Sequence, residues 1–200
     1  MTATALDMLR ADHRNLWQLL NILEAQINEF KEGKSPDYEV IQCILDYCLD
    51  YPAEVHHPRE DLIYDRLKAK DKTATAEIMD LRADHEDLAA RTRGVANAVD
   101  LVLQEAAYSR EWIGTATRNF LDAYRQHIRR EENEIFPLAE RNLDDADWQA
   151  IEQRFTDAKD PLNNLNTEQR FEILRKYIVD FNALGKPGEP ITVAETQPTC

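Results

Sequence analysis

Four of the five histidines in this 200-residue chain form a repeated pattern with two glutamates. The order along the chain is H, HxxxE, H, HxxxE, and its members are His13, His56, Glu60, His85, His127 and Glu131. Residues four apart lie one above the other on a helix face, so each HxxxE pair can direct an imidazole nitrogen and a carboxylate oxygen at one point. Such a pair is a chelate for a metal ion.

The chemistry of this set indicates which metal it suits. Burying two carboxylates in an otherwise aliphatic stripe is costly unless cations meet them, and no lysine or arginine occupies the neighbouring stripe positions. Four histidines and two glutamates exceed the four ligands of a tetrahedral zinc site, and no thiolate accompanies them. The set favours two first-row ions bridged by the carboxylates, and iron is the leading candidate.

The segments that must position these residues are duplicated as well. The string LRADH occurs at 9–13 and again at 81–85, and apolar residues recur around both copies at steps of three and four. This spacing predicts amphipathic helices with His13 and His85 in core positions. The two HxxxE segments carry less regular stripes. Pro58 is expected to kink the first of them, so that its metal-binding pair sits less regularly than the second.

Short connectors separate the four segments and indicate how they are arranged. They lie near residues 31–38, 69–74, 106–111 and 141–147. Connectors of this length typically join antiparallel neighbours. The predicted fold is all-α: an up-down-up-down four-helix bundle with two additional C-terminal helices.

The connectors also fix the heights of the histidines. His13 lies about 17 residues before the first bend and His56 about 18 residues after it, so at about 1.5 Å per residue the two meet at one level. The corresponding counts for His85 and His127 are about 21 and 18, which agree within roughly one turn. The duplication then brings all four histidines to the same part of the bundle interior.

The predicted bundle occupies residues 1–141. Residues 144–155 and 166–181 each carry apolar positions at helical spacing, which predicts a fifth and a sixth helix. Both are expected to pack on the outside of the bundle as an extension over 142–184, and a partner-binding hairpin is the alternative. The end of the chain, 185–200, contains glycine and proline without periodicity, and is predicted to be a flexible tail.

Charge and composition exclude several partners. The formal net charge is −14, so nucleic acid or an anionic membrane surface would repel the chain. No basic-then-apolar leader opens the sequence, and no run of about 18 apolar residues occurs. Three cysteines do not make a paired disulfide framework. We expect a cytoplasmic protein that binds neither nucleic acid nor membrane, and the oligomeric state stays open.

The pattern H…HxxxE…H…HxxxE resembles that of the hemerythrin-like, or HHE cation-binding, proteins over about residues 5–140. The stretch HIRREENEIFPL at 127–138 is especially similar to the second HxxxE helix of that family. The resemblance implies a four-helix bundle that binds two non-haem iron ions, with the glutamates bridging and the histidines terminal. Carried over by position, all six members of the repeated pattern are metal ligands.

The chain departs from the oxygen-carrying hemerythrins, which use a fifth histidine. The motif supplies four, and His57 lies about 100° around the helix from His56, which suggests a supporting or surface role. A coordination position is therefore unfilled or differently filled. It could admit O2, NO or peroxide, or be closed by Tyr51, Tyr124 or Glu24. We interpret the two tyrosines as core aromatics and Glu24 as a solvated surface residue.

Two classes of function follow from the resemblance. The first is a di-iron protein that reacts with small oxidants, namely O2, NO or peroxide, with redox turnover. The alternative is a non-catalytic protein that binds, stores or senses O2 or iron. The missing fifth histidine favours the first class over pure carriage of O2.

Overall fold

The computed structural model describes residues 4–103, 109–155, 162 and 174–179, and every element in these residues is helical. In chain order the elements are α1 (Thr4–Lys31), α2 (Tyr38–Tyr51), η1 (Pro52–His56), α3 (His57–Lys70), η2 (Lys72–Ala74), α4 (Thr75–Leu103), α5 (Arg110–Arg130), η3 (Glu131–Ile135), α6 (Phe136–Asn142) and α7 (Asp145–Glu152). The elements η1 and η3 are single π turns, and η2 is a 3-10 turn. The predicted all-α class is confirmed for the described residues.

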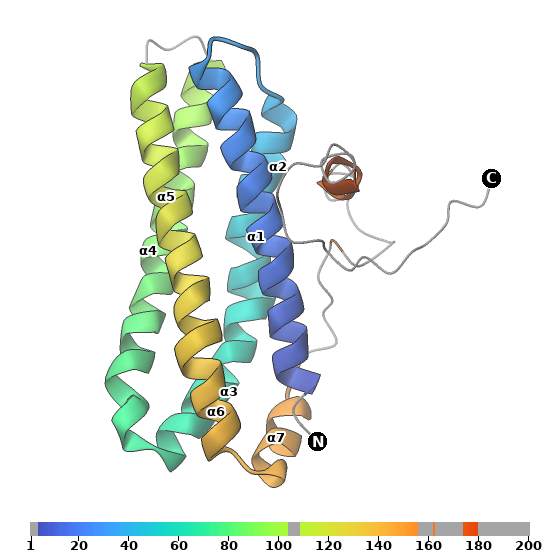
Figure 1. Cartoon of the computed structure of the whole chain (residues 1–200), viewed down its shortest axis with the longest axis vertical. Helices are drawn as coiled ribbons and strands as arrows, with labels where there is room; N and C mark the ends of the chain where they lie inside the picture. The colour runs from blue at the N-terminus through green and yellow to red at the C-terminus, as the bar shows by residue number, and fades with distance from the viewer. Residues whose placement is uncertain (1–3, 104–108, 156–161, 163–173, 180–200) are drawn as a thin grey trace, which may run out of the picture.

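Four long helical segments lie side by side and alternate in direction (Figure 1). The first is α1, the second is the continuous run α2–η1–α3, the third is α4, and the fourth is the run α5–η3–α6. Helix α1 packs against α2 and α5, and α4 packs against the same two helices. The arrangement is consistent with the predicted up-down-up-down bundle. The connections at 32–37, 71–74 and 143–144 fall within predicted connectors, and most of the connection between α4 and α5 lies outside the described residues.

Local signals fix where the helices begin and end. The side chain of Asp37 accepts a hydrogen bond from the amide of Val40 at the start of α2, and Ser109 accepts one from the amide of Trp112 at the start of α5. Beyond the end of α1, Gly33 has a φ of 86°, in the left-handed region that favours glycine. These signals fix where α1 ends and where α2 and α5 begin, and so help to set the heights of the histidines on these segments.

Two apolar clusters fill the interior, and a polar layer separates them. On α1, Leu9 belongs to one cluster and Leu16 to the other, with the buried His13 between them. The other buried polar residues of this layer include His56, Glu60, His127 and Glu131. The helices keep polar outer faces. Within the described residues, no helix is both long enough and apolar enough to span a bilayer.

Each HxxxE segment contains a π turn just before a proline. The amide of His57 donates to the carbonyl of Pro52, and the amide of Phe136 donates to the carbonyl of Glu131, five residues back in each case. The next residue in both segments is a proline, which has no amide hydrogen to continue the ladder. The irregularity expected around Pro58 is therefore present, but the second segment has one too, which the sequence analysis did not expect.

The predicted fifth helix is present as α7, which packs against α1 and α3. Its buried face includes Trp148 and Ile151. Of the predicted sixth helix, only 174–179 lies within the described residues; it is helical, and Leu174 and Ile178 are buried. The rest of that segment and the predicted tail at 185–200 lie outside the described residues.

Candidate metal centre

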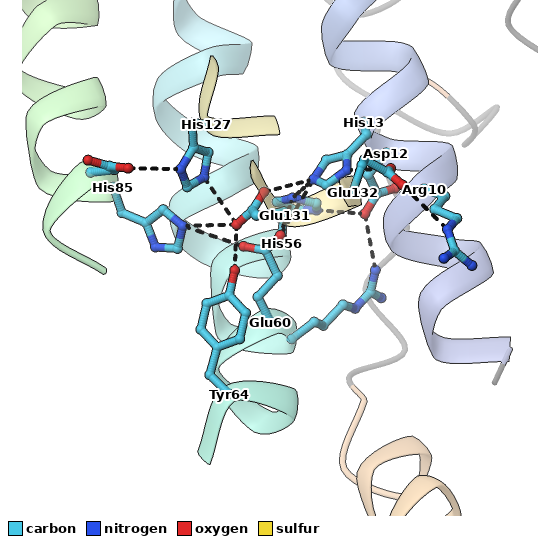
Figure 2. Close-up of polar contacts among 12 residues, drawn as sticks. Arg10, Asp12, His13, His56, Glu60, Tyr64, His85, His127, Glu131 and Glu132 are labelled. Atoms are coloured by element: carbon cyan, nitrogen blue, oxygen red, sulfur yellow. Dashed lines mark hydrogen bonds and ion pairs between the residues drawn. The ribbon is translucent and has the colours of Figure 1, made fainter. Parts of the chain in front are cut away.

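The polar layer brings all six residues of the repeated pattern to one place (Figure 2). Helices α1 and α4 supply one histidine each, and each HxxxE segment supplies a histidine and a glutamate: His13, His85, His56, Glu60, His127 and Glu131. The two carboxylates lie in the middle of the group. Imidazole rings approach them from all four helical segments.

The Glu131 carboxylate contacts histidines from both halves of the duplication. Its oxygens lie 3.2 Å from His13 Nε2, 3.2 Å from His127 Nε2 and 3.7 Å from His85 Nε2. The hydroxyl of Tyr64 donates a hydrogen bond of 2.5 Å to Glu131 Oε1. Glu131 is fully buried, so its charge is surrounded by imidazoles and one phenol rather than by water.

Glu60 takes an equivalent position in the other half. Its oxygens lie 3.0 Å from His56 Nε2, 3.5 Å from His13 Nε2 and 3.5 Å from His85 Nε2. Glu60 is also fully buried. Each carboxylate therefore faces imidazoles from both halves, which is the placement that a bridging ligand between two ions requires.

The donor atoms of this cluster fit a metal. Both oxygens of Glu60, Glu131 Oε2 and His85 Nε2 are buried without a hydrogen-bond partner. Within the part of the chain that the structure describes, no lysine or arginine pairs with either glutamate. Buried carboxylates left in this way are very unfavourable unless cations meet them. The set of imidazole nitrogens and carboxylate oxygens suits first-row transition metals.

His57 lies closer to the cluster than its sequence position suggested. Its ring stacks on that of His85, with centroids 3.6 Å apart and planes 5° from parallel. Together with His127, these residues form a group whose donor atoms all lie within 4.8 Å of one another. Burial and the charge of His85 lower the pKa of His57 to about 3, so its imidazole is neutral. The wider π turn that ends at His56 explains why two consecutive histidines both reach the interior.

A second group with the same spacing forms on the other side of the layer. It contains His13, His56, Glu60 and Glu131, all buried, again with donor atoms within 4.8 Å. One group takes its histidines, His13 and His56, from the first half of the duplication, whereas the other combines His85 and His127 of the second half with His57 of the first. The structure thus presents two adjacent places for an ion.

Every polar residue of the LRADH string has a role in this centre. The histidine enters the cluster, and the aspartate before it contacts the HxxxE histidine of the same half. Asp12 Oδ2 lies 3.1 Å from His56 Nδ1, and Asp84 Oδ2 lies 3.7 Å from His127 Nδ1. A carboxylate hydrogen-bonded to Nδ1 orients the ring so that Nε2 points toward a metal. The Asp12 contact has hydrogen-bond length, whereas His127 Nδ1 has no hydrogen-bond partner among the described residues, and Asp84 contributes its charge.

The arginine of each copy reaches across to the other half. Arg10 donates to Glu132 at 3.4 Å, and Arg82 donates to Asp61 at 2.6 Å; both acids directly follow a cluster glutamate. Glu132 also lies 2.8 Å from His13 Nδ1. The repeated pentapeptide therefore supplies a histidine of the cluster, an aspartate beside another histidine of the cluster, and a cation that pairs with an acid of the other half.

Comparison with known protein families gives a match that includes the residues of this cluster. The family model described as the hemerythrin HHE cation binding domain matches residues 4–139. The chain belongs to the hemerythrin HHE cation-binding domain family. The match covers both LRADH copies and both HxxxE pairs, and it confirms the resemblance carried by those motifs. A separate search of curated proteins gave no match.

The sequence analysis named three further residues for the open coordination position, Glu24, Tyr51 and Tyr124. Glu24 is partly exposed and pairs with Arg125 at 2.7 Å, in agreement with a surface role. Tyr51 is buried and stacks on Tyr47, with ring centroids 5.3 Å apart. Tyr124 is buried too, and burial raises its pKa well above the usual value.

The sequence analysis missed Tyr64, although a signal for it exists. Tyr64 follows Glu60 by four residues, so it continues the stripe that already contains the first HxxxE pair. Burial and the charges of Glu131 and Glu60 raise the pKa of Tyr64 well above its usual value. The phenol is therefore neutral, and it donates its proton to the hydrogen bond with Glu131.

Without metal, protons on the histidines balance the buried carboxylates. Burial disfavours a charged imidazole, but the charge of Glu60 and the hydrogen bond to Asp12 outweigh it and raise the pKa of His56 to about 9. In the same way, Glu131 raises the pKa of His127 to about 10 against the effect of burial. A metal ion must displace these protons when it binds, because imidazole coordinates in its neutral form.

Substitution of Asp12 tests whether this carboxylate orients the ring of His56. Asp12→Asn is expected to lower metal affinity by about 10- to 100-fold, because the neutral amide holds the His56 ring less firmly. Equilibrium dialysis against a competing chelator measures the change. Asp7→Asn, an exposed substitution of the same kind on α1, is the matched control. Unchanged affinity in a folded Asp12→Asn variant would contradict the role.

Proposed function

We propose that this chain is a hemerythrin-like four-helix bundle that holds two non-haem iron ions and reacts with a small oxidant: O2, NO or peroxide. The observation that carries the proposal is the pair of fully buried carboxylates, Glu60 and Glu131, surrounded by imidazole nitrogens at 3.0–3.7 Å. Among the described residues, the imidazole nitrogens and carboxylate oxygens at this place suit first-row transition-metal ions better than other cations.

The proposed ligands are the six residues of the repeated pattern together with His57. One ion would be held by His13 and His56, and the other by His85, His127 and His57, with the two glutamates between them. This division follows the two groups of donor atoms. The ion next to His13 then has one imidazole fewer than its neighbour, so an exogenous small molecule is expected on that side.

When bound, iron would supply redox chemistry and exchangeable coordination positions for O2, NO or peroxide. The chain would supply the surroundings. The apolar clusters above and below the polar layer limit the access of water. Asp12 and Glu132 would keep the imidazoles of His56 and His13 oriented, and Tyr64 would hold one oxygen of Glu131.

We further propose that residues 1–141 form the metal-binding unit and that 142–184 form an extension on its surface. Packing of α7 against α1 and α3 supports the second part. Within that extension, the burial of Leu174 and Ile178 indicates that the later helix also has an inner face.

Stopped-flow mixing tests the reactivity. The iron-loaded, reduced protein is expected to change its absorption spectrum with O2 and with at least one of NO and H2O2, and to do so through repeated cycles when a reductant is supplied. A spectral change with O2 that vacuum reverses completely would favour the alternative, a non-catalytic protein that binds O2. Stable iron binding with no response to any of the three would favour storage or sensing of iron. A His85→Ala, His127→Ala variant controls for loosely bound iron.

A further inference from the structure

A cleft of about 440 Å3 lies between α1 and the α5–η3 segment, next to the metal centre. Six of its lining residues determine its chemistry: Arg10, His13, Arg14, Trp17, Arg129 and Glu132. The four from α1 stand at i, i+3, i+4 and i+7, so they form one face of that helix. Helices α1 and α5 are neighbours along their length (Figure 1).

The positive charges in this cleft are not all neutralised. Arg10 pairs with Glu132 and with a second glutamate, on α6. Arg14 and Arg129 pair with no carboxylate in the part of the chain that the structure describes. The guanidinium of Arg129 instead lies 5.0 Å from the centre of the Trp17 ring. Two unpaired cations therefore border one small volume, in a chain whose formal net charge is −14.

The internal duplication provides a comparison for these charges. In the other half of the chain, the position of Arg14 is taken by Glu86, and the position of Arg129 is taken by Pro58. The scaffold that positions the metal ligands therefore does not need arginine at either place. The guanidinium groups of Arg14 and Arg129 therefore occur on only one side of the candidate metal centre, the side of His13.

The same side lacks one imidazole. His57, which stacks on His85 in one half, corresponds in sequence to Ile128, which lines the cleft beside His13. One side of the centre thus has a third histidine, whereas the other has an apolar residue and a cleft. The cleft adjoins the side on which the proposed metal centre has fewer protein ligands.

We propose that this cleft binds a small oxyanion of the carboxylate or phosphate class, held by the guanidinium groups of Arg14 and Arg129 beside His13. Guanidinium groups present planar donors that match pairs of carboxylate or phosphate oxygens. A concave site with an excess of charge of one sign concentrates ligands of the opposite sign, and three arginines line this cleft against one glutamate. A volume of about 440 Å3 is sufficient for a small organic anion.

An anion in the cleft would lie close to the metal centre without entering the cluster. Glu132 lines the cleft and lies 2.8 Å from His13 Nδ1, while His13 Nε2 is part of the cluster (Figure 2). The bound anion would therefore be placed to act as a substrate or effector of the reaction on this side. Binding itself depends only on residues of the chain and can be measured without metal.

Isothermal titration of the metal-free full chain tests the site, with inorganic phosphate and benzoate as separate probes. Saturable binding of at least one probe is expected, and the probe that binds assigns the phosphate or the carboxylate class. Arg14→Gln and Arg129→Gln are each expected to weaken it on the order of tenfold, as loss of a charge-assisted hydrogen bond does. Arg129→Lys should keep part of the affinity, because it retains the charge but not the planar donors.

Arg93→Gln is the matched control, since it removes the same charge from an exposed position on α4. Its affinity is expected to equal that of the unaltered protein. Failure of both probes to bind saturably, or equal weakening by Arg93→Gln, would overturn the proposal. If Arg14→Gln does not fold, as judged by its helical circular dichroism, Arg129→Gln decides the question. Because no metal is present, the result is independent of whether the chain holds iron.

Discussion

A His85→Ala, His127→Ala double variant is expected to hold at most one iron ion per chain, where the unaltered protein is expected to hold two. The substitutions remove two of the three imidazoles of one group and leave His57 without the ring on which it stacks. The other group, which contains His13 and His56, keeps all its donor atoms. Thermal stability should fall together with occupancy, because metal binding contributes to the free energy of folding.

Anaerobic loading followed by metal quantification measures this result. The matched control is Glu86→Ala with Gln126→Ala, which changes the exposed neighbours of the same two histidines. The control should keep two ions and its melting temperature. Full occupancy by two ions in the histidine double variant would rule out the ligand assignment, while loss of both ions would show that the two positions fill only together.

The sequence sufficed to predict that these histidines and glutamates would cluster, because most of the required spacing lies within single helices. Helical stepping placed His13 in a core position between Leu9 and Leu16, and the structure puts it there, buried between two apolar clusters. The four-residue spacing of His56 and Glu60 likewise needs only the geometry of one helix. Connector lengths then sufficed to bring the segments to a common height.

What the sequence did not predict depends on contacts between helices or on a local change of winding. The partner of Asp12 is His56, on a neighbouring segment, and no pattern within one helix reveals that pairing. His57 was placed by assuming regular α-helical winding, whereas the π turn over η1 lets it reach His85. A proline can signal such a turn, as Pro137 does in the second segment, but whether the helix widens or kinks there is decided by packing.

The two halves of the chain also show how a duplicated scaffold becomes asymmetric. Arg10 and Arg82 make equivalent contacts, so the parts that hold the helices together are the same. The difference lies in a few positions beside the cluster, such as His57 and its counterpart Ile128. Differences of this kind leave the bundle intact and distinguish the two sides of the candidate metal centre.

Removal of the metal is expected to make the stability of the protein fall steeply with rising pH. In the metal-free protein the pKa of His56 is about 9 and that of His127 about 10, both raised by carboxylates against the effect of burial, whereas an unfolded histidine titrates near 6.5. A folded-state pKa above the unfolded value means that the contribution to stability is fully present below about pH 6.5 and is lost as the pH rises through about 9 to 10.

In acid, stability is expected to fall for a different reason, as Glu60 and His57 illustrate. The pKa of Glu60 is about 2, because His56 and His13 outweigh burial and the Glu131 charge, so its contribution is present above about pH 4.5 and is lost as the pH falls toward 2. The pKa of His57 is about 3, so the unfolded chain takes up a proton below about pH 6.5 that the folded chain does not, which also lowers stability in acid. The metal-free protein should therefore be most stable in weak acid, near about pH 6.

Urea unfolding of the chelated and the iron-loaded protein, followed by circular dichroism between about pH 6 and pH 10, measures both curves. Iron coordinates neutral imidazole, so its binding strengthens as the histidines lose their protons, and the gap between loaded and chelated protein should widen with pH. In a chelated Glu60→Gln, Glu131→Gln variant the alkaline loss should shrink, because the carboxylates that raise the histidine pKa values are gone. A chelated protein that is as stable at about pH 9 as at about pH 6 would show that the histidines are not paired with the buried carboxylates as the structure places them.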